Sequence, residues 1–581
     1  MAKTDNLLTG GDLLARTLRE AGVKRIFALH GGHHEALFKG CHEQGIELMD
    51  FRHESAAGHA ADAYARTTGD LGVCIITAGP GFTNGVSAIA NAKLDGSPVL
   101  FIIGAPPLRE VETNPLQGGI DQIAMARPMT KWAFSIPTTE RIPDLTAMAI
   151  RKARAGTKGP VVLELPIDVL HMKVPASRAT KAAGVNVAPH PAPSAGEVAA
   201  LAELVRSAER PAIIAGTEAA NVATAEALRR FAAATGIPCF FKSQAMGLLP
   251  HDHAQNGGSP GNLAGLMLMG GNRPDLVILL GGKLGLLLGG RSGAIVPDAA
   301  KLVQVHSDAT EIGRLRSVDL AIAAGTAETL DALGEALEGA DPTAFAGWCQ
   351  EATSLKGAMA AMFPDPNAAK NGVHPYHAAK AVCAAAGRDA CYAFDGGEAA
   401  SWGGDAVQVD GPCQVLGHGY LGCLGIGPGF AIGLQVAHPD RRVVHLTGDG
   451  AMGFHIQEFD TMVRHNLPIV TVVFNNGVWG MSIHGQQLMY GANYNIITQI
   501  AGTRYADIAA AFGCHAERVD RLEDVGSAME RAFASGKPAM VEIMVDADVV
   551  HPVTASMLGQ IAEGSSDVMI PYYENIPAEA T

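Results

Sequence analysis

Two apolar segments in the last third of the chain are each followed by small and polar residues. Gly448-Asp449-Gly450 follow the apolar run 442–447, and Asn475-Asn476 follow the apolar run 467–474. Residues 452–465, between them, have helical periodicity. This pattern predicts a strand, a helix and a parallel strand. It places the polar residues at the carboxyl ends of both strands, which is the edge where open α/β sheets bind ligands.

The residue types at this edge suit a metal ion and a diphosphate. The carboxylate of Asp449 and the amide oxygen of Asn476 are hard oxygen donors. Together with the backbone carbonyl of Val478, they suit an octahedral Mg²⁺ that also binds phosphate oxygens. Gly448 and Gly450 let the backbone approach a diphosphate and leave N–H groups to bind it. The sequence therefore predicts a magnesium–diphosphate site.

A second candidate for chemistry, Glu54, lies near the N-terminus. It falls between a predicted strand over 46–51 and a predicted helix over 56–66. Its neighbours are mainly alanine, glycine and apolar residues, so we expect its carboxyl group to be buried. The small residues after it should allow close packing against a flat ring.

Composition bounds the class of protein. The chain has 581 residues, of which 48% are hydrophobic and 69 are glycine, which suits roughly three α/β domains with buried parallel sheets. The net charge of -15 disfavours nucleic acid as a partner. No apolar run has membrane-spanning length. The nine cysteines are dispersed and contain no CxxC pair, which indicates reduced thiols and a cytoplasmic protein.

Strands and helices alternate along three regions, which predicts doubly wound parallel sheets. We expect an N-terminal domain over 1–175, a central domain over 196–340 and a C-terminal domain over 373–550, followed by a tail over 551–581 that forms a flap or an arm. Residues 175–195 are rich in proline and small residues and are predicted to be a linker. The segment 341–372 is also expected to be loose. The predicted strands are 25–29, 46–51, 72–77, 98–103, 160–165, 211–215, 276–280, 301–305, 442–447 and 467–474.

The glycine–aspartate–glycine motif, a helix and two asparagines resemble the cofactor signature of thiamine-diphosphate enzymes. Further runs resemble benzaldehyde lyase, a branch of the acetolactate-synthase-like enzymes of that superfamily. The resemblance extends from about residue 9 to 545, and its motifs are LHGGHH at 29–34, RHE at 52–54, TAGPGFTN at 77–84, LQGGIDQ at 116–122, TKW at 130–132 and HGYLG at 418–422.

The resemblance implies roles for individual residues. Glu54 would share a proton with the aminopyrimidine ring of the cofactor and so activate its thiazolium carbon. His33 and Gln117 would face the reactive carbon, and His30 would support His33 or reach the substrate. The implied cofactor contacts are Glu54, Gly396, Gly397, Gly422, Leu424, Asp449, Gly450 and Asn476, with Leu424 as an apolar wedge that holds thiamine diphosphate bent and Gly422 offering a carbonyl to its amine.

The implied substrate pocket departs from the family pattern. His418 would line it, but Ile167, Ala400 and Gly485 stand where benzaldehyde lyase has aromatic residues, and Met481 replaces a small alanine. These differences remove ring-stacking partners. We therefore expect the thiamine-diphosphate chemistry of the family to be retained, whereas the identity of the substrate stays open.

The resemblance implies an N-terminal domain that binds the pyrimidine ring of the cofactor, a central domain, and a C-terminal domain that binds the diphosphate. It also implies a homodimer or homotetramer whose active sites combine Glu54 of one chain with Asp449 of another. The expected reaction cleaves or forms 2-hydroxy ketones (acyloins) from aldehydes, because no fixed cation for a carboxylate is evident.

Three alternatives stay open. The first is a 2-oxo-acid decarboxylase or acetolactate-synthase-type transferase. The second is a 2-hydroxyacyl-CoA lyase, which would need a nucleotide site in the central domain, where no GxGxxG motif follows a strand. The third is a non-catalytic relative, which the retention of Glu54 and of the metal motif disfavours.

Overall fold

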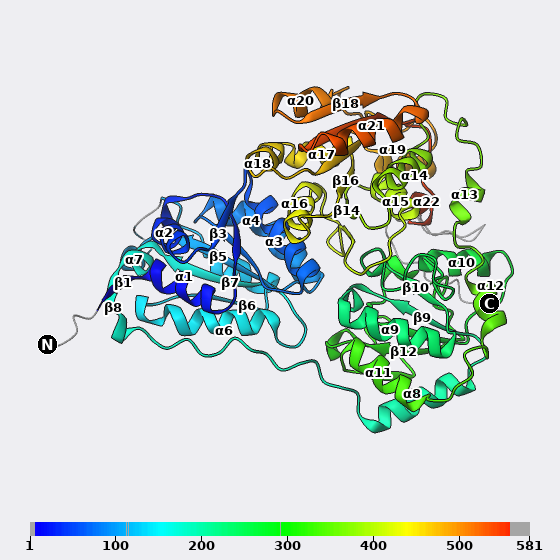
Figure 1. Cartoon of the computed structure of the whole chain (residues 1–581), viewed down its shortest axis with the longest axis horizontal. Coiled ribbons are helices and arrows are strands. Elements are labelled where there is room, and N and C mark those ends of the chain that lie inside the picture. The colour runs from blue at the N-terminus through cyan, green and yellow to red at the C-terminus, as the bar shows by residue number, and fades with distance from the viewer. Residues whose placement is uncertain (1–5, 112, 114–115, 291, 558–581) are drawn as a thin grey trace. The chain divides into compact units, whose positions relative to one another are not determined.

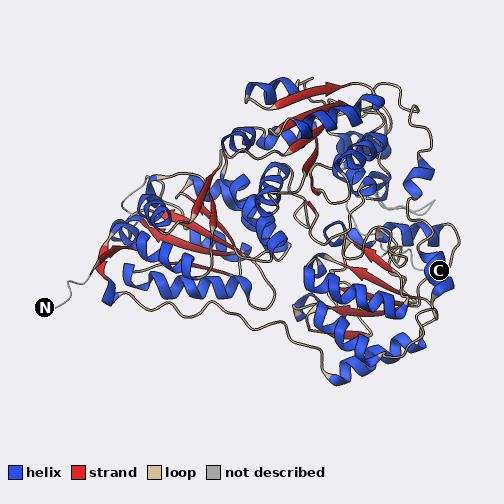
Figure 2. Ribbon diagram, in the orientation of Figure 1, coloured by secondary structure: helices blue, strands red, loops and turns tan. Residues whose placement is uncertain are grey.

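The computed structural model describes residues 6–111, 113, 116–290 and 292–557. It divides into two compact units. Unit 1 comprises Met1–Pro189, His418–Asp440 and His455–Ile469, and unit 2 comprises His190–Gly417, Arg441–Phe454 and Val470–Thr581. Three parallel sheets of five or six strands, flanked by helices, confirm the predicted α/β fold (Figures 1 and 2).

The sheet of unit 1 has six parallel strands in the order β3-β2-β4-β5-β7-β6. The direction of winding reverses between β2 and β4, so the loops that follow these two strands flank a topological switch point. The strand bounds are β2 (Arg25–Ala28), β3 (Glu47–Asp50), β4 (Gly72–Ile76), β5 (Val99–Ala105), β6 (Trp132–Ser135) and β7 (Val161–Pro166).

Helices and a short two-stranded sheet complete unit 1 (Figure 1). The antiparallel strands are β1 (Leu7–Thr9) and β8 (Lys173–Pro175). Helix α1 begins after Thr9, whose hydroxyl forms a capping box with Asp12. The longer helices are α1 (Gly10–Glu20), α2 (Glu35–Glu43), α3 (Glu54–Thr68), α4 (Pro80–Leu94), α6 (Ile142–Arg154) and α16 (Gly427–Ala437).

Ala56 and Ala60 of α3 pack against glycines of α16. A Cβ on Gly429 would lie 2.6 Å from the carbonyl oxygen of Ala56, and a Cβ on Gly433 would lie 2.5 Å from that of Ala60. No side chain fits at such distances, so both positions on α16 require glycine for the contact. Whether other small residues of α3 pack against a flat ring stays a prediction.

Unit 2 contains two further parallel sheets. The central sheet has the order β10-β9-β11-β12-β13, and the C-terminal sheet has the order β15-β14-β16-β17-β19-β18. The bounds are β9 (Pro211–Ala215), β10 (Cys239–Phe241), β11 (Leu276–Leu280), β12 (Lys301–Val305), β13 (Leu320–Ile322), β14 (Cys391–Phe394), β15 (Val415–Gly417), β16 (Val443–Gly448), β17 (Val470–Asn475), β18 (His515–Val519) and β19 (Ala539–Met544).

The predicted strands are all confirmed to within a few residues, and two other predictions need correction. The single helix expected over 452–465 is two helices, α17 (Asp449–His455) and α18 (Glu458–Arg464). The segment expected to be loose contains α12 (Ala346–Ala352) and α13 (Ala358–Met362). The tail begins with α22 (Pro552–Ser556), and the expectation of a flap or arm concerns residues 558–581, outside the described residues. Among the described helices, none is both long and apolar enough to cross a membrane.

Candidate active site

Glu54 is the first residue of α3, and its side chain is buried, with 7% of the residue exposed. The ring of His53 caps the helix by accepting the backbone N–H of Ser55 at 3.2 Å. The amide nitrogen of Asn84 on α4 donates to Oε2 of Glu54 at 3.0 Å. A Cβ on Gly81 would lie 3.6 Å from Oε1. The predicted burial of Glu54 is therefore confirmed, and α4 holds one of its carboxylate oxygens.

His33 lies at the switch point of the unit 1 sheet, in the short helical turn η1 (Gly32–His34) that follows β2. Its Nδ1 is 3.1 Å from the hydroxyl oxygen of Thr77, which follows β4. A Cβ on Gly104 would lie 2.8 Å from Cβ of His33, so the ring stands against the end of β5. Burial, and to a smaller extent His171, lower the pKa of His33. The imidazole is therefore neutral near pH 7 and able to donate or accept a proton.

Gln117 lies over the loop that follows β4. Its backbone has a φ of 54°, in the left-handed region, which costs a residue other than glycine on the order of 1 kcal/mol. A Cβ on Gly79 would lie 3.0 Å from Cα of Gln117. The side chain of Gln122 accepts the N–H of Gly79 at 2.9 Å and donates to Glu164 at 2.8 Å. The turn that carries Gln117 is thus built against an anchored glycine, and such strain is typical of functional positions.

Of two other predicted residues of unit 1, Ile167 belongs to a helix that packs against the turn of His33, and His30 has partners of its own. His30 is exposed, pairs with Glu35 at 2.9 Å and stacks on Phe38. Thr77, rather than His30, supports His33 in this structure. Ile167 is half-buried at the start of α7 (Ile167–His171). Its carbonyl oxygen is 3.0 Å from Nδ1 of His171.

The predicted cofactor contacts Gly422 and Leu424 and the predicted pocket residue His418 share one loop of unit 1. Gly422 and Gly425 have φ values of 67° and 79°, so the chain turns sharply on both sides of Leu424. The loop is held at Tyr420, whose N–H donates to the buried carboxylate of Asp95 at 3.4 Å. These turns leave Leu424 half-buried.

In unit 2 the switch point of the C-terminal sheet lies between β14 and β16. The loop after β14 carries Gly396 and the loop after β16 carries Asp449. Gly396 has a φ of 90°, and a Cβ there would lie 3.3 Å from the backbone nitrogen of Gly448. The two loops therefore approach closely at the edge where the diphosphate is predicted.

Asp449 is almost fully buried, and its two carboxylate oxygens accept the N–H groups of Gly450 at 2.9 Å and Gly477 at 2.8 Å. Burial raises the pKa of Asp449 to about 6, although these N–H groups favour the charged form. The amide oxygen of Asn476 is 3.2 Å from the N–H of Val478, so the three predicted metal ligands are neighbours. A buried carboxylate beside neutral oxygen donors fits Mg²⁺, which would offset the cost of burying the charge.

Within the described residues there is no group of three or more histidine, cysteine, aspartate or glutamate side chains suited to a metal. Asp449 is thus the one acidic ligand in the predicted set, and amide, carbonyl and phosphate oxygens would complete the coordination. Such a shared site is typical of Mg²⁺ bound together with a phosphorylated ligand.

The predicted pocket residues of unit 2 lie on two helices. Met481 and Gly485 are on α19 (Gly480–Tyr490), and Ala400 is on α15 (Glu398–Ala406). A Cβ on Gly397 would lie 3.1 Å from Cβ of Met481, so this methionine covers the loop after β14. Gly485 is buried, yet a Cβ on it would meet no atom of the described residues within 4 Å. Within the described part of the chain, the missing side chain at Gly485 therefore leaves space beside α19.

A buried ion pair that was not predicted from the sequence lies next to these pocket residues. Nδ1 of His484 is 2.9 Å from both carboxylate oxygens of Glu398, joining α19 to α15. Burial opposes the charging of His484, but the hydrogen bond and the charge of Glu398 outweigh it and raise its pKa. Only the position of His484 next to Gly485 could have drawn attention to it. Thr77 and Asn84 were also missed as individual residues, although both belong to the motif at 77–84.

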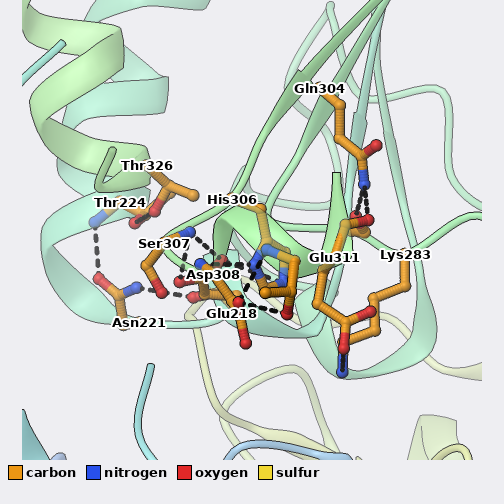
Figure 3. A network of polar contacts seen from close by, with 12 residues as sticks. Glu218, Asn221, Thr224, Lys283, Gln304, His306, Ser307, Asp308, Glu311 and Thr326 are labelled. Carbon is orange, nitrogen blue, oxygen red and sulfur yellow. Dashed lines mark hydrogen bonds and ion pairs between the residues drawn. The ribbon is translucent and has the colours of Figure 1, made fainter. Parts of the chain in front are cut away.

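The corresponding edge of the central sheet is occupied by a network of its own side chains (Figure 3). Both carboxylate oxygens of Glu218 accept the N–H of Ser307, and one lies 3.3 Å from the ring of His306. Lys283 pairs with Glu311 at 3.4 Å. A Cβ on Gly216 would lie 2.3 Å from Cα of Gly282, so the loops at this switch point are in backbone contact.

Three family models match the chain. They are the N-terminal thiamine pyrophosphate (TPP) binding domain at residues 8–125, the central domain of thiamine pyrophosphate enzymes at 198–333, and the C-terminal TPP binding domain at 395–543. The chain belongs to the thiamine pyrophosphate enzymes. The cofactor is therefore thiamine diphosphate, typically bound with Mg²⁺, and the residues around Asp449 fit both.

Curated relatives cover most of this enzyme. A probable acetolactate synthase from Mycobacterium bovis is 32% identical over 93% of this chain and 96% of its own. The 2-hydroxyacyl-CoA lyase 2 of Homo sapiens is 30% identical over 92% of this chain and 90% of its own. The acetolactate synthase large subunit of Corynebacterium glutamicum is 29% identical over 97% of this chain and 90% of its own. This enzyme thus lies in the acetolactate-synthase-like group of thiamine pyrophosphate enzymes.

Proposed function

We propose that this thiamine pyrophosphate enzyme is a carbon–carbon lyase and carboligase that cleaves or forms 2-hydroxy ketones. The observation that carries the proposal is a set of uncharged polar groups in unit 1 that lie on or against the loops after β2 and β4 or bind Glu54. His33, Thr77, Asn84 and Gln117 offer hydrogen-bond donors and acceptors without a net positive charge. Such a set suits the oxygens of a ketone, an alcohol and an aldehyde, whereas a 2-oxo acid also needs a partner for its carboxylate.

Bound thiamine diphosphate supplies the nucleophilic carbon and the electron sink that this chemistry requires. The residues of the chain would do the rest. Glu54 would exchange a proton with the pyrimidine ring, and Asn84 would fix the orientation of its carboxylate. The neutral ring of His33, oriented by Thr77, would hold or move a proton at the substrate oxygen. The amide of Gln117 would stabilise negative charge on the same oxygen.

The pocket residues favour aliphatic or mixed acyloins over benzoin-like compounds. Ile167, Ala400 and Gly485 present no aromatic surface, and no atom of the described residues would lie within 4 Å of a Cβ on Gly485. A substrate ring would therefore find few partners for stacking. Met481 is flexible and apolar, and it can adapt to chains of different shape.

A 2-hydroxyacyl-CoA lyase is the second candidate, and the human relative of that name supports it. Its reaction also breaks the bond next to a hydroxyl-bearing carbon, so the same residues would serve. Against it stands the network of Figure 3, where Glu218, His306 and Ser307 already satisfy one another at the central sheet edge. The acetolactate synthase relatives support a third candidate, which acts on a 2-oxo acid.

The deciding experiment compares kcat/KM of the holoenzyme for acetoin, benzoin, pyruvate and a 2-hydroxyacyl-CoA. We expect acetoin or a mixed acyloin to be best. Pyruvate at least about tenfold better than both acyloins, a difference of about 1.4 kcal/mol in transition-state binding, would replace the proposal with a decarboxylase or synthase. The same advantage for the acyl-CoA would establish the second candidate.

We also propose that the active enzyme is a homodimer or homotetramer, on the basis of the family resemblance. Light scattering of the holoenzyme after size exclusion measures this directly. A monomer that retains full activity would contradict it.

A further inference from the structure

A buried carboxylate in unit 2 lies directly after the loop of Gly396 and Gly397, where the diphosphate is predicted to bind. Glu398 is the first residue of α15, and 8% of it is exposed. A Cβ on Gly480, the first residue of α19, would lie 3.2 Å from its Oε2 and 3.6 Å from the amide nitrogen of Asn476. Glu398 and the predicted metal ligand Asn476 therefore approach the same point at the start of α19.

The carboxylate of Glu398 is held by donors from two later parts of the chain. Nδ1 of His484 on α19 lies 2.9 Å from both of its oxygens. Oε1 also accepts the hydroxyl of Thr554 on α22, and the backbone N–H of His551 at 3.4 Å. Donors from α19 and from the C-terminal segment, residues 547–554, thus converge on one buried group.

The hydrogen bonds of His484 require a charged ring. Its Nε2 lies 2.8 Å from the carbonyl oxygen of Ala547, which can only accept. Its Nδ1 faces the carboxylate of Glu398, which also accepts, so both ring nitrogens carry protons. Burial lowers the pKa of His484, but the hydrogen bond and the charge of Glu398 outweigh it, and the pKa is raised. Removal of either charge would leave the other buried without its partner.

Helix α22 has a second anchor on α15. Nε2 of His551 lies 3.0 Å from the carboxylate of Asp405, and the ring of His551 packs edge-on against Trp402 with the centroids 4.2 Å apart. These contacts do not involve Glu398. Helix α22 therefore stays attached to α15 when the hydroxyl of Thr554 is removed, and the bond from Thr554 to Glu398 can be tested by itself.

We propose that Glu398 and His484 are positioning residues for the diphosphate of the cofactor, and that the C-terminal segment holds this pair in place. The pair fixes the start of α15, and with it the loop of Gly396 and Gly397, against the start of α19. Neither side chain touches the cofactor in this scheme. All of these groups belong to unit 2 of one chain. The proposal rests on the predicted diphosphate contacts of Gly396 and Gly397, and it does not depend on the substrate.

The proposal implies an effect in both directions. If the contacts of the C-terminal segment with Glu398 and His484 strengthen cofactor binding, bound cofactor must stabilise those contacts by the same free energy. The two directions can be measured separately, because one appears as the affinity for the cofactor and the other as the protection of residues 547–554.

The test uses variants that change single hydrogen bonds of the pair. Thr554→Val keeps the shape of the side chain and removes the hydroxyl that donates to Glu398, whereas Thr554→Ser keeps a hydroxyl. Glu398→Gln removes the charge opposite His484. Ser556→Ala is the matched control, because the hydroxyl of Ser556 is exposed on the same helix and donates to the carbonyl oxygen of Val553 at 2.7 Å.

The first readout is the Kd of thiamine diphosphate at saturating Mg²⁺, measured by isothermal titration calorimetry of the full-length apoprotein. We expect Kd to rise at least about fivefold in Thr554→Val and at least about tenfold in Glu398→Gln, because each loses a buried hydrogen bond that involves a charge. Thr554→Ser and Ser556→Ala should stay within about twofold of the wild type. A change that only lowered the stability of the fold would reduce the fraction of protein able to bind, whereas the Kd of the folded protein would not change.

The second readout is hydrogen–deuterium exchange with and without Mg²⁺ and thiamine diphosphate, followed on peptides that cover residues 547–556. In the wild type the cofactor should slow exchange there, and in Thr554→Val it should slow exchange less. Thr554→Ser and Ser556→Ala should show the wild-type difference.

A wild-type Kd in Thr554→Val or in Glu398→Gln would overturn the proposal, as would equal Kd values for valine and serine at position 554. Exchange of residues 547–556 that the cofactor leaves unchanged in the wild type would also overturn it. If Glu398→Gln does not fold, the comparison of valine with serine at position 554 decides.

Neither readout involves a substrate, so an error in the proposed reaction would leave both results intact. Asp449→Ala, titrated in parallel, reports separately on the predicted metal site. If that variant binds thiamine diphosphate with the wild-type Kd, the metal assignment fails, and the variants at position 554 still decide whether the pair supports cofactor binding.

Discussion

A buried carboxyl group on α18 should make the stability of unit 1 depend on pH. Glu458 is fully buried, and its carboxylate oxygens accept the backbone N–H of Arg52 at 3.2 and 3.3 Å and the hydroxyl of Thr461 at 2.7 Å. Arg52 lies in the turn that leads to Glu54. Burial raises the pKa of Glu458 to about 7, even though these hydrogen bonds favour the charged form.

The sign and size of the effect follow from this pKa. The folded protein binds the proton of Glu458 more tightly than the unfolded chain, whose glutamate has a pKa of 4.5. The contribution of protonated Glu458 to the free energy of unfolding is therefore fully present below about pH 4.5 and is lost as the pH rises through about 7. A difference of about 2.5 pKa units corresponds to about 3 kcal/mol, of which about 2.5 kcal/mol falls between pH 5 and pH 8.

Glu458→Gln removes the titration and keeps an amide oxygen that can accept the N–H of Arg52. The free energy of unfolding of both apoproteins should be measured in urea from pH 5 to pH 8, with hydrogen exchange of α3 peptides as the probe of unit 1. The free energy of unfolding of the wild type minus that of the variant should fall by about 2.5 kcal/mol from pH 5 to pH 8. A difference that does not change with pH would show that Glu458 is charged throughout and that the reasoning from its burial is wrong.

The other predictions concern the cofactor and the pocket. Asp449→Ala, or removal of magnesium by a chelator, should release thiamine diphosphate, because the metal joins the diphosphate to the protein; equilibrium dialysis measures this, and unchanged cofactor content would refute the metal assignment. Glu54→Gln should retain the cofactor but exchange its thiazolium proton about a hundred- to ten-thousandfold more slowly; exchange at the wild-type rate would remove Glu54 from its role. Gly485→Phe should fill the open space beside α19 and shift kcat/KM toward compact acyloins; an unchanged ratio of rates for acetoin and benzoin would place Gly485 outside the pocket.

Much of the site could be predicted from the sequence because its ligands follow strands. Asp449 and Asn476 come directly after two apolar runs, and those runs are β16 and β17 as expected. Glu54 was expected between a strand and a helix, and it is the first residue of α3. Parallel strands end at a common edge, so residue type and position were enough to group such ligands.

Contacts between segments distant in sequence could not be predicted in this way. The two glycines of α16 gave no sign in the sequence that they would meet Ala56 and Ala60 of α3. Thr77 rather than His30 supports His33, because the switch point brings the ends of β2 and β4 together. The short helices α12 and α13 were missed because their segment lacks a long periodic pattern.

The sequence alone determined the α/β class and the cofactor and named the groups that we propose carry the chemistry, because these depend on residue type and on spacing along neighbouring strands and helices. The tertiary structure decided how those groups are held. The partnership of His455 with Ser55 and Gly425, the burial of Glu458 under Arg52 and the pairing of His484 with Glu398 each join residues from separate segments of the chain. Such hydrogen bonds depend on how helices and loops pack in three dimensions, and local sequence pattern carries no record of that packing.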